Sequence, residues 1–312
     1  MKMPAIALTV LVALGSTALA QQRSGPFTIA ESGAGYGSLA DAVNAIGAGT
    51  GTIVIAPGTY RDCAVQLGGT ITYRAATPGT AVFDGGICEE KAALVLRGRA
   101  ARVEGIVFQN MRVPDGNGSG IRLEQGDLEV TNSMFRNSEE GILTHDDPAH
   151  AIRIDQSTFQ RLGRCDRDLS CAHSIYVGHY GSLTVTRSRF EAGNGGHYVK
   201  SRANSVTIDD NSFDDSKGRL TNYMIDLSNG SAGAITGNEM VQGKDKDNWS
   251  AFITVAPEGR ERDSSALSVS GNSASFAPGI QRQSTFVANW TDDAVRIGQN
   301  RLATGVKITD RR

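Results

Sequence analysis

The chain has 312 residues, of which 31 are lysine or arginine and 33 are aspartate or glutamate, so its net charge is −2 at pH 7. A charge this close to zero gives no overall attraction to a polyanion, and the basic residues are too dispersed to indicate nucleic-acid binding. Any anion site must therefore come from a local cluster of cations.

The first twenty residues are predicted to be a secretory signal peptide. Lys2 precedes an apolar run over residues 6–14, and the segment ends in Ala-Leu-Ala, which is a small-x-small cleavage signal. The run is too short to span a bilayer, and no later segment is apolar enough to do so. We expect a protein that is secreted or periplasmic, with residues 21–312 forming a single domain.

One helix is predicted near the start of the mature chain. Ser38 is a suitable N-cap and Gly47 is a suitable end. Between them, apolar residues recur on one face from Leu39 to Ile46. The next segment, TIVIAPGTY at 52–60, is predicted to be a buried strand followed by a turn.

From about residue 100 the chain repeats a short pattern. The pattern is an apolar residue, any residue, Val or Ile, four residues, and then Phe or another large apolar anchor. These anchors are Phe108, Phe135, Phe159, Phe190, Phe213, Met240 and Leu302. Two residues before the later anchors stands a serine or asparagine that can bond to backbone at a bend, namely Ser133, Ser157, Ser188, Asn211, Asn238 and Asn300.

The spacing of the anchors predicts the fold. From Phe108 to Met240 they are 27, 24, 31, 23 and 27 residues apart. A period in the twenties with short strands indicates a solenoid, because one coil cannot bury its apolar face whereas stacked coils share a continuous core. The variable spacing is typical of a parallel β-helix rather than of leucine-rich or hexapeptide repeats. We predict an all-β, right-handed parallel β-helix with an N-terminal capping helix.

The segment SLADAVNAIGAGTGTIVIAPGTY, residues 38–60, resembles the opening segment of the pectate-lyase-like β-helix superfamily. It has the order of a capping helix, a first strand and PGTY. The resemblance implies that β-helix coils occupy the rest of the mature chain. Members of the superfamily include lyases, hydrolases, esterases, epimerases and non-catalytic adhesins, so the fold alone does not determine the activity.

Each coil also contains a second predicted strand, whose second residue is always Ile or Val. The seven segments are 120–124, 141–145, 174–178, 198–202, 224–228, 252–256 and 286–290. Side chains alternate faces along a strand, so the third and fifth residues of each segment point outward. In a stack of coils, these positions form two outward columns.

The third-residue column places Tyr176, Lys200 and Asp226 on successive coils, with Arg122 two coils before Tyr176. Adjacent coils of a β-helix lie ~4.8 Å apart, so neighbouring side chains in the column are expected to touch. Random surface positions would scatter such chemistry over the molecule. We therefore expect one functional patch on the central coils.

The fifth-residue column adds Arg202 beside Lys200, and His145 across the gap left by Gly178. His173 and His197 fall at matching positions on adjacent coils, just before the second strands. A single histidine is more often structural than catalytic, but three in register favour a site. Their spacing does not indicate a metal site.

Four cysteines, Cys63, Cys88, Cys165 and Cys171, allow three pairings. Cys63 and Cys88 are 25 residues apart, which is about one coil, and Cys165 and Cys171 are six apart. We therefore favour the disulfides Cys63–Cys88 and Cys165–Cys171 as structural links in an oxidising compartment. The second would close a loop over residues 160–172, which we expect to wall the site.

The patch favours β-elimination of a uronic acid. This reaction needs a base for the proton next to the carboxylate, a cation that neutralises the carboxylate, and an acid for the departing oxygen. We assign catalysis to Lys200, Arg202, Tyr176 and His197, and substrate binding to His145, His173, Asp226 and Arg122. Lys200 is the first choice of base, but close pairing with Asp226 would make it a binding residue.

The Lys-x-Arg pair is similar in residue type to that of β-helix lyases of the alginate lyase and chondroitinase B type. That resemblance implies a Lys and an Arg as base and acid, and calcium as a possible cofactor. The segments 209–215 and 245–248 carry several acids that calcium could bind, although solvated turn acids are the simpler interpretation.

A hydrolase fits these residues less well than a lyase does, and two further functions stay open. A hydrolase needs two carboxylates roughly 5–9.5 Å apart, whereas Asp226 and Glu124 would lie about 19 Å apart on this face. A uronan C5-epimerase stays open, because it takes the same proton and returns it to the other face. A non-catalytic carbohydrate-binding protein also stays open, with Lys200 and Asp226 as a plain ion pair. We expect a monomer.

Overall fold

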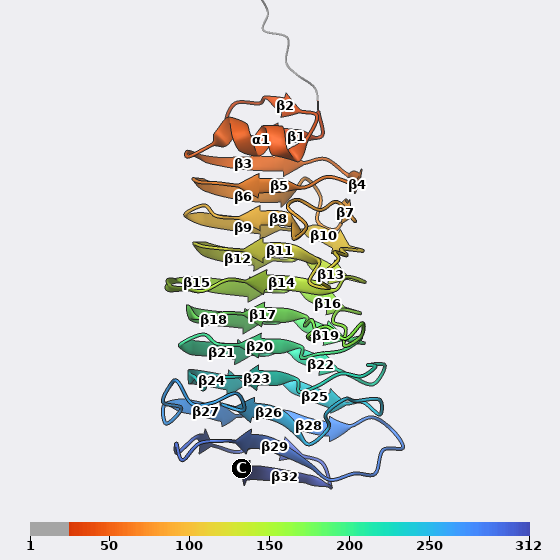
Figure 1. Ribbon diagram of the computed structural model, residues 1–312, viewed down its shortest axis with the longest axis vertical. Helices are drawn as coiled ribbons and strands as arrows, with labels where there is room; N and C mark the ends of the chain where they lie inside the picture. Colours follow the sequence, from red (N-terminus) through yellow and green to blue (C-terminus); the bar gives the residue numbers. More distant parts are fainter. Residues whose placement is uncertain (1–24) are drawn as a thin grey trace, which may run out of the picture.

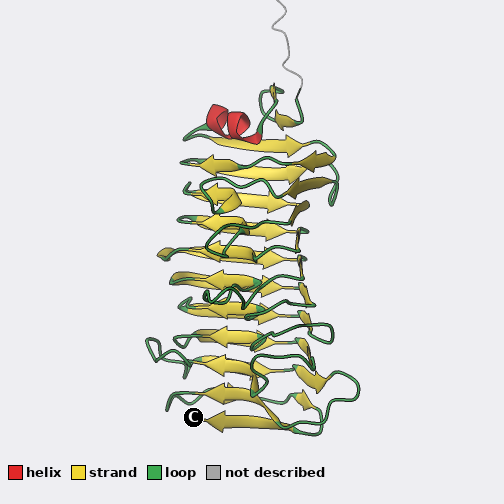
Figure 2. Cartoon of the chain, turned by 45° about the vertical axis from the view of Figure 1, so that its right-hand side comes forward, coloured by secondary structure: helices red, strands yellow, loops and turns green. Residues whose placement is uncertain are grey.

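The computed structural model describes residues 25–312, which form one continuous stack of right-handed coils (Figure 1). The predicted signal peptide lies outside the described residues. Each full coil contributes one strand to each of three parallel sheets, and loops of unequal length join the strands (Figure 2). The predicted β-helix is therefore confirmed.

In sheet A, β1 pairs antiparallel with both β2 and β3, and the sheet is parallel from β3 onward. In spatial order its strands are β2 (Gly35–Tyr36), β1 (Phe27–Ile29), β3 (Thr50–Ile55), β6 (Thr70–Ala75), β9 (Ala100–Glu104), β12 (Asp127–Thr131), β15 (Asp147–Asp155), β18 (Tyr180–Thr186), β21 (Ser205–Asp209), β24 (Ala232–Thr236), β27 (Leu267–Ser270) and β30 (Arg296–Ile297).

Sheets B and C are parallel throughout. Sheet B contains β4 (Gly58–Tyr60), β7 (Ala81–Asp84), β10 (Ile106–Gln109), β13 (Met134–Arg136), β16 (Thr158–Gln160), β19 (Arg189–Glu191), β22 (Ser212–Asp214), β25 (Glu239–Gln242), β28 (Ser273–Phe276) and β31 (Arg301–Leu302). Sheet C contains β5 (Ala64–Gln66), β8 (Ala92–Leu96), β11 (Ser119–Leu123), β14 (Glu140–Thr144), β17 (Ile175–Val177), β20 (Val199–Ser201), β23 (Ile225–Leu227), β26 (Ala251–Val255), β29 (Ser284–Asn289) and β32 (Val306–Arg311).

Helix α1 (Leu39–Ile46) covers the N-terminal end of the stack (Figure 1). The side chain of Ser38 accepts a hydrogen bond from the backbone N–H of Asp41 at 3.1 Å, and Gly47 ends the helix with a φ of 57°. Leu39 and Val43 are buried against the first coil. The predicted capping helix is thus confirmed, and it shields core that a first coil would otherwise expose. Within residues 25–312, no helix combines the length and hydropathy needed to cross a membrane.

A stack of phenylalanine rings fills the core behind sheet B. Neighbouring ring centres lie 4.8 to 5.7 Å apart, which matches the spacing of strands. The rings belong to Phe83, Phe108, Phe135, Phe159, Phe190 and Phe213, and all are buried. The anchors of the sequence repeat are therefore the core residues of successive coils.

The serine and asparagine residues before the anchors form a hydrogen-bonded ladder along the bend. The side chain of Ser157 accepts from the backbone N–H of Ser133 at 3.2 Å, and that of Asn238 accepts from Asn211 at 3.0 Å. Asn272 continues the ladder on a coil that the sequence pattern missed. The pattern failed there because the anchor is the small residue Ala274.

Both predicted disulfides, Cys63–Cys88 and Cys165–Cys171, are present. The second closes a loop that Arg164 also holds, because its guanidinium donates to the carbonyl oxygens of Ser170 at 2.9 Å and Gly116 at 3.4 Å. Two disulfides are compatible with an extracellular protein. The loop is thereby fixed against the face of sheet C.

Candidate active site

The predicted outward column lies on the face of sheet C. Tyr176 in β17 pairs with Lys200 in β20, and Lys200 pairs with Asp226 in β23, in the register expected from the sequence. Nζ of Lys200 lies 5.4 Å from the centre of the Tyr176 ring. Nε of Arg202 donates a hydrogen bond to Oη of Tyr176 at 3.1 Å. A phenol, an ammonium and a guanidinium therefore meet on one face.

Asp226, on the next coil, lies beside Lys200 and joins this group. Its carboxylate is buried and accepts hydrogen bonds from the hydroxyls of Thr254 and Ser228, both at 2.8 Å. Oδ2 lies 3.7 Å from Nζ of Lys200 and 3.6 Å from Nε2 of His197. Asp226 thus holds two of the predicted catalytic side chains, and its own oxygens are already bound by protein donors.

Glu258 completes the group and was not predicted. It follows β26 by three residues, and its half-exposed carboxylate binds both Nζ of Lys200 and Nη2 of Arg202. Burial opposes ionisation, but these hydrogen bonds prevail and lower the pKa of Glu258. We call Tyr176, Lys200, Arg202, Asp226 and Glu258 the central patch. Its two cations and two carboxylates balance, so the patch as it stands carries no net charge.

The presence of Glu258 corrects the sequence-based count of acids on this face. Two carboxylates, Asp226 and Glu258, approach the same ammonium of Lys200. The separation of about 19 Å, on which a hydrolase was discounted, therefore does not describe the site. Glu258 itself does not suit the role of the acid in a hydrolase, because that acid needs a raised pKa and the hydrogen bonds from Lys200 and Arg202 lower the pKa of Glu258.

The histidines form a second column beside the patch. The rings of His173 and His197 stack with centres 5.0 Å apart, and Tyr223 continues the stack at 5.6 Å. Nδ1 of His173 accepts a hydrogen bond from the backbone N–H of His197 at 3.0 Å, so that nitrogen carries no proton. Burial lowers the pKa of His197, and lowers that of His173 still further below its ordinary value. Both rings are therefore neutral near pH 7.

A cavity of about 430 Å³ adjoins the central patch toward the N-terminal coils. We call it the side pocket, and it is bounded by Arg122, Glu140, His145, Ser170, Tyr176 and Arg202. The structure thus brings His145 and Arg122, both predicted to bind substrate, to one cavity. The disulfide-closed loop supplies its wall through Ser170 and Cys171, as expected.

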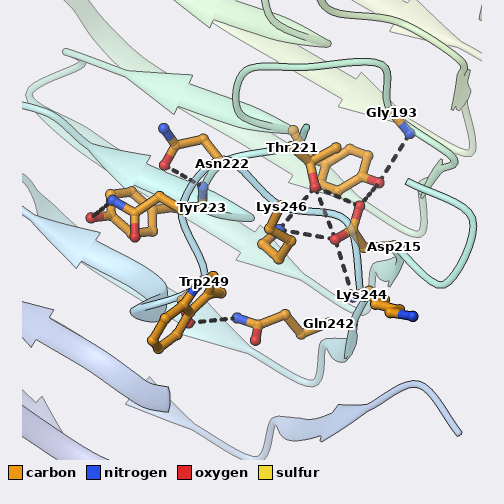
Figure 3. A network of polar contacts seen from close by, with 12 residues as sticks. Gly193, Asp215, Thr221, Asn222, Tyr223, Gln242, Lys244, Lys246 and Trp249 are labelled. Atoms are coloured by element: carbon orange, nitrogen blue, oxygen red, sulfur yellow. Dashed lines mark hydrogen bonds and ion pairs between the residues drawn. The ribbon is translucent and has the colours of Figure 1, made fainter. Parts of the chain in front are cut away.

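A buried ion pair joins the loop before β23 to the loop before β26 (Figure 3). Nζ of Lys246 lies 2.9 Å from Oδ2 of Asp215, and neither side chain has exposed surface. Oη of Tyr198 donates to Oδ1 of Asp215 at 2.7 Å, and Thr221 also donates to this carboxylate. Burial lowers the pKa of Lys246 against the opposing effect of Asp215. The same loops hold Tyr223 through Asn248 (Figure 3).

The acidic segments considered for calcium do not provide a fitting site. Both oxygens of Asp215 are occupied by protein donors, so Asp215 is neither a calcium ligand nor a solvated turn acid. Across residues 25–312, no three His, Cys, Asp or Glu side chains are grouped as a metal ion would require. We therefore derive no step through calcium.

Comparisons with known proteins identify the architecture. A family model described as "Right handed beta helix region" matches residues 92–289. An alginate lyase of the PL6 family superposes with a TM-score of 0.51 and 16% identity, over 81% of this chain and 36% of that one. The pectin methylesterase of Aspergillus niger gives a TM-score of 0.56 and 13% identity, over 81% of this chain and 88% of that one.

These likenesses concern the fold alone, because the identities are low. This chain spans about a third of the length of the alginate lyase. No protein of curated function matches the sequence.

Proposed function

The chain belongs to the family of right-handed β-helix regions, and we propose that it cleaves an acidic polysaccharide by β-elimination at the central patch. The observation that carries the proposal is the carboxylate of Glu258, which Lys200 and Arg202 bind together. A uronic acid residue presents the same chemical group. The two cations are therefore already arranged for one carboxylate.

In this proposal, Lys200 and Arg202 bind the carboxylate of the substrate. The proton on the adjacent carbon becomes acidic only when the charge of that carboxylate is neutralised. Lys200 contacts Asp226 and Glu258, which is the environment of a binding cation rather than of a proton acceptor. These contacts favour the binding role over the base role first expected for Lys200.

Tyr176 is the side chain proposed to carry the proton. It lines the side pocket, and its oxygen accepts from Arg202, so charge that develops on the oxygen lies against a guanidinium. In its deprotonated form, Tyr176 takes the C5 proton of the uronate, and the electron pair of the C5–H bond forms the C4–C5 double bond. The C4–O4 bond breaks, and the departing O4 takes this same proton from Tyr176, which returns to the phenolate.

Glu258 must leave before the substrate binds. The charges of the central patch balance while Glu258 is paired, so the patch attracts a second carboxylate only after Glu258 is displaced. Glu258 lies on a loop outside the sheets, with its side chain half exposed. Its departure needs no change in the coils.

The proposal is tested by incubating purified protein with alginate, pectate and glucuronan. The named activities of the two similar structures direct the choice of the first two. A lyase releases an unsaturated product that absorbs in the ultraviolet, an epimerase alters sugar composition without cleavage, and a binding protein does neither. Product is expected, and its absence with all three polymers overturns the proposal.

Variants then assign the roles. Tyr176→Phe is expected to lower kcat by about 10²–10⁴-fold, the usual contribution of a proton-transferring side chain. Lys200→Met is expected chiefly to raise KM. Lys217→Met, a change at an exposed lysine outside the patch, is the matched control.

A further inference from the structure

The side pocket contains two polar groups that the proposed reaction does not use. Nε of Arg122 and Oε2 of Glu140 are both buried without a hydrogen-bond partner. Arg122 projects from β11, and Glu140 begins β14 on the next coil. Buried polar groups are nearly always paired, so two unpaired groups on residues that line one cavity favour a ligand-binding role for that cavity.

Arg122 carries charge that the surrounding acids do not compensate. Its nearest carboxylate is Glu124, at 3.9 Å. Glu124 is closer to Lys91, at 2.8 Å, and to Arg97, at 2.5 Å. Glu89 is shared by the same Lys91 and Arg97. Three cations thus share two carboxylates, and the guanidinium of Arg122 is the one that lines the pocket.

Burial disfavours the ionised form of Glu140. Its side chain is buried, and Oε1 accepts the backbone N–H of His173 at 3.1 Å. Burial raises the pKa of Glu140 well above its ordinary value, and Asp115 and Glu139 act in the same direction, against the backbone bond and Arg122. A carboxylic acid can donate a hydrogen bond from its free oxygen, which a carboxylate cannot do.

We propose that the side pocket binds a second uronic acid residue of the polysaccharide, next to the residue held at the central patch. Arg122 binds the carboxylate of this second sugar, and Glu140 donates a hydrogen bond to it. Tyr176 and Arg202 border both the pocket and the patch, so the two sugars lie on adjoining sites. A volume of about 430 Å³ falls in the range of small-molecule sites, roughly 300–1,000 Å³.

The inference rests on the proposed function for the identity of the sugar. It predicts that affinity grows with chain length between one and two residues. A protein that recognised one sugar at the central patch alone would bind the monomer and the dimer about equally. The gain on the second sugar is therefore the quantity to measure.

The test is calorimetric titration of Tyr176→Phe protein, whose turnover is expected to be strongly reduced, with galacturonate and alginate oligomers of one to four residues. The dimer is expected to bind at least about 10-fold more tightly than the monomer, as one charge-assisted contact of about 1.5–3 kcal/mol allows. Adding Arg122→Gln is expected to remove this gain and to leave monomer affinity unchanged. Arg153→Gln, on the exposed face of sheet A, is the matched control.

Glu140 is tested in the same background. Glu140→Ala is expected to weaken dimer binding more than Glu140→Gln does, because the amide of glutamine keeps a donor at this place. The reverse order would show that Glu140 acts as an anion. Thermal unfolding of each variant identifies those that fail to fold. If the Glu140 variants do not fold, the affinities for monomer and dimer with and without Arg122→Gln decide whether the side pocket binds the second sugar.

The outcomes separate this inference from the proposed function. A chain-length gain that Arg122→Gln removes supports the pocket even when the unaltered protein forms no unsaturated product. If the protein forms unsaturated product but Arg122→Gln still binds the dimer more tightly than the monomer, the proposed second site is overturned and the proposed lyase activity stands. Absence of binding by every oligomer contradicts both.

Discussion

At the scale of single residues, Asp226 and Glu140 differ in the partners that surround their carboxyl groups. Asp226 is buried, but two hydroxyls and the nearby ammonium of Lys200 compensate it. Glu140 has no such donors at Oε2, and burial therefore raises its pKa. The same type of group thus has compensating donors in one coil and lacks them in another.

Breaking the buried ion pair of Lys246 and Asp215 is expected to destabilise the protein strongly. Lys246→Met leaves the Asp215 carboxylate buried without its cation, and loss of one partner of a buried pair costs about 3–5 kcal/mol. Urea unfolding measures the change. Lys244→Met, at an exposed lysine of the same loop, is the control, and an equal effect of the two changes would contradict the structural role (Figure 3).

Mild acid is expected to weaken the fold through the buried histidines. Burial lowers the pKa of His173 and His197 below the value of 6.5 that an unfolded chain has. These histidines therefore bind protons in the unfolded chain at a pH at which they stay neutral in the folded chain. The free energy of unfolding falls as the pH drops through about 6.5. Melting temperatures between about pH 7 and pH 5 measure this loss, which His173→Phe is expected to reduce.

His150 supplies the control for this pH dependence. It is partly exposed, and its contact with Asp147 raises its pKa, so the folded chain binds its proton more readily. His150→Gln is expected to enlarge the loss in acid rather than to reduce it. An equal loss in the unaltered protein, His173→Phe and His150→Gln would contradict the expected contribution of His173.

At the scale of elements, the site divides into strand residues and loop residues. The register of sheet C fixes Tyr176, Lys200 and Asp226 on consecutive coils. The loop after β26 brings Glu258 to the patch and Glu261 to within 3.0 Å of His179. The strands therefore set the positions of Tyr176, Lys200 and Asp226, while the loop adds Glu258 to them.

Removing the charge of Glu258 is expected to strengthen substrate binding. Glu258→Gln frees Lys200 and Arg202 from the carboxylate that competes with the substrate, so KM should fall at unchanged or higher kcat. Steady-state rates of ultraviolet product formation measure both constants. Glu239→Gln, at an exposed glutamate of sheet B, is the control. Weaker binding by Glu258→Gln would mean that Glu258 contacts the sugar itself.

The sequence predicted the strand part of the site because alternation and the repeat fix it. Tyr176 and Lys200 follow from aligning equivalent positions, whereas Glu258 follows β26 in a loop whose path depends on tertiary contacts. Glu140 could have been found. It stands two residues before an inward isoleucine, the position that His173 and His197 occupy on the next coils.

At the scale of the whole molecule, stacking of the coils places equivalent residues of successive repeats side by side on the face of sheet C. Each coil buries the phenylalanine anchor of its neighbour, and the outer side chains are stacked at the same spacing. The number of coils was harder to predict than the β-helix fold itself. A pattern that requires a large apolar anchor misses the coil whose anchor is Ala274. A long face of this kind suits a polymer whose sugars repeat along it.

The most direct test is a crystal structure of Tyr176→Phe protein with a bound uronate oligosaccharide. One sugar carboxylate is expected between Nζ of Lys200 and the guanidinium of Arg202, with Glu258 displaced from both. An oligosaccharide bound elsewhere, with Glu258 still paired to Lys200 and Arg202, would contradict the proposed site.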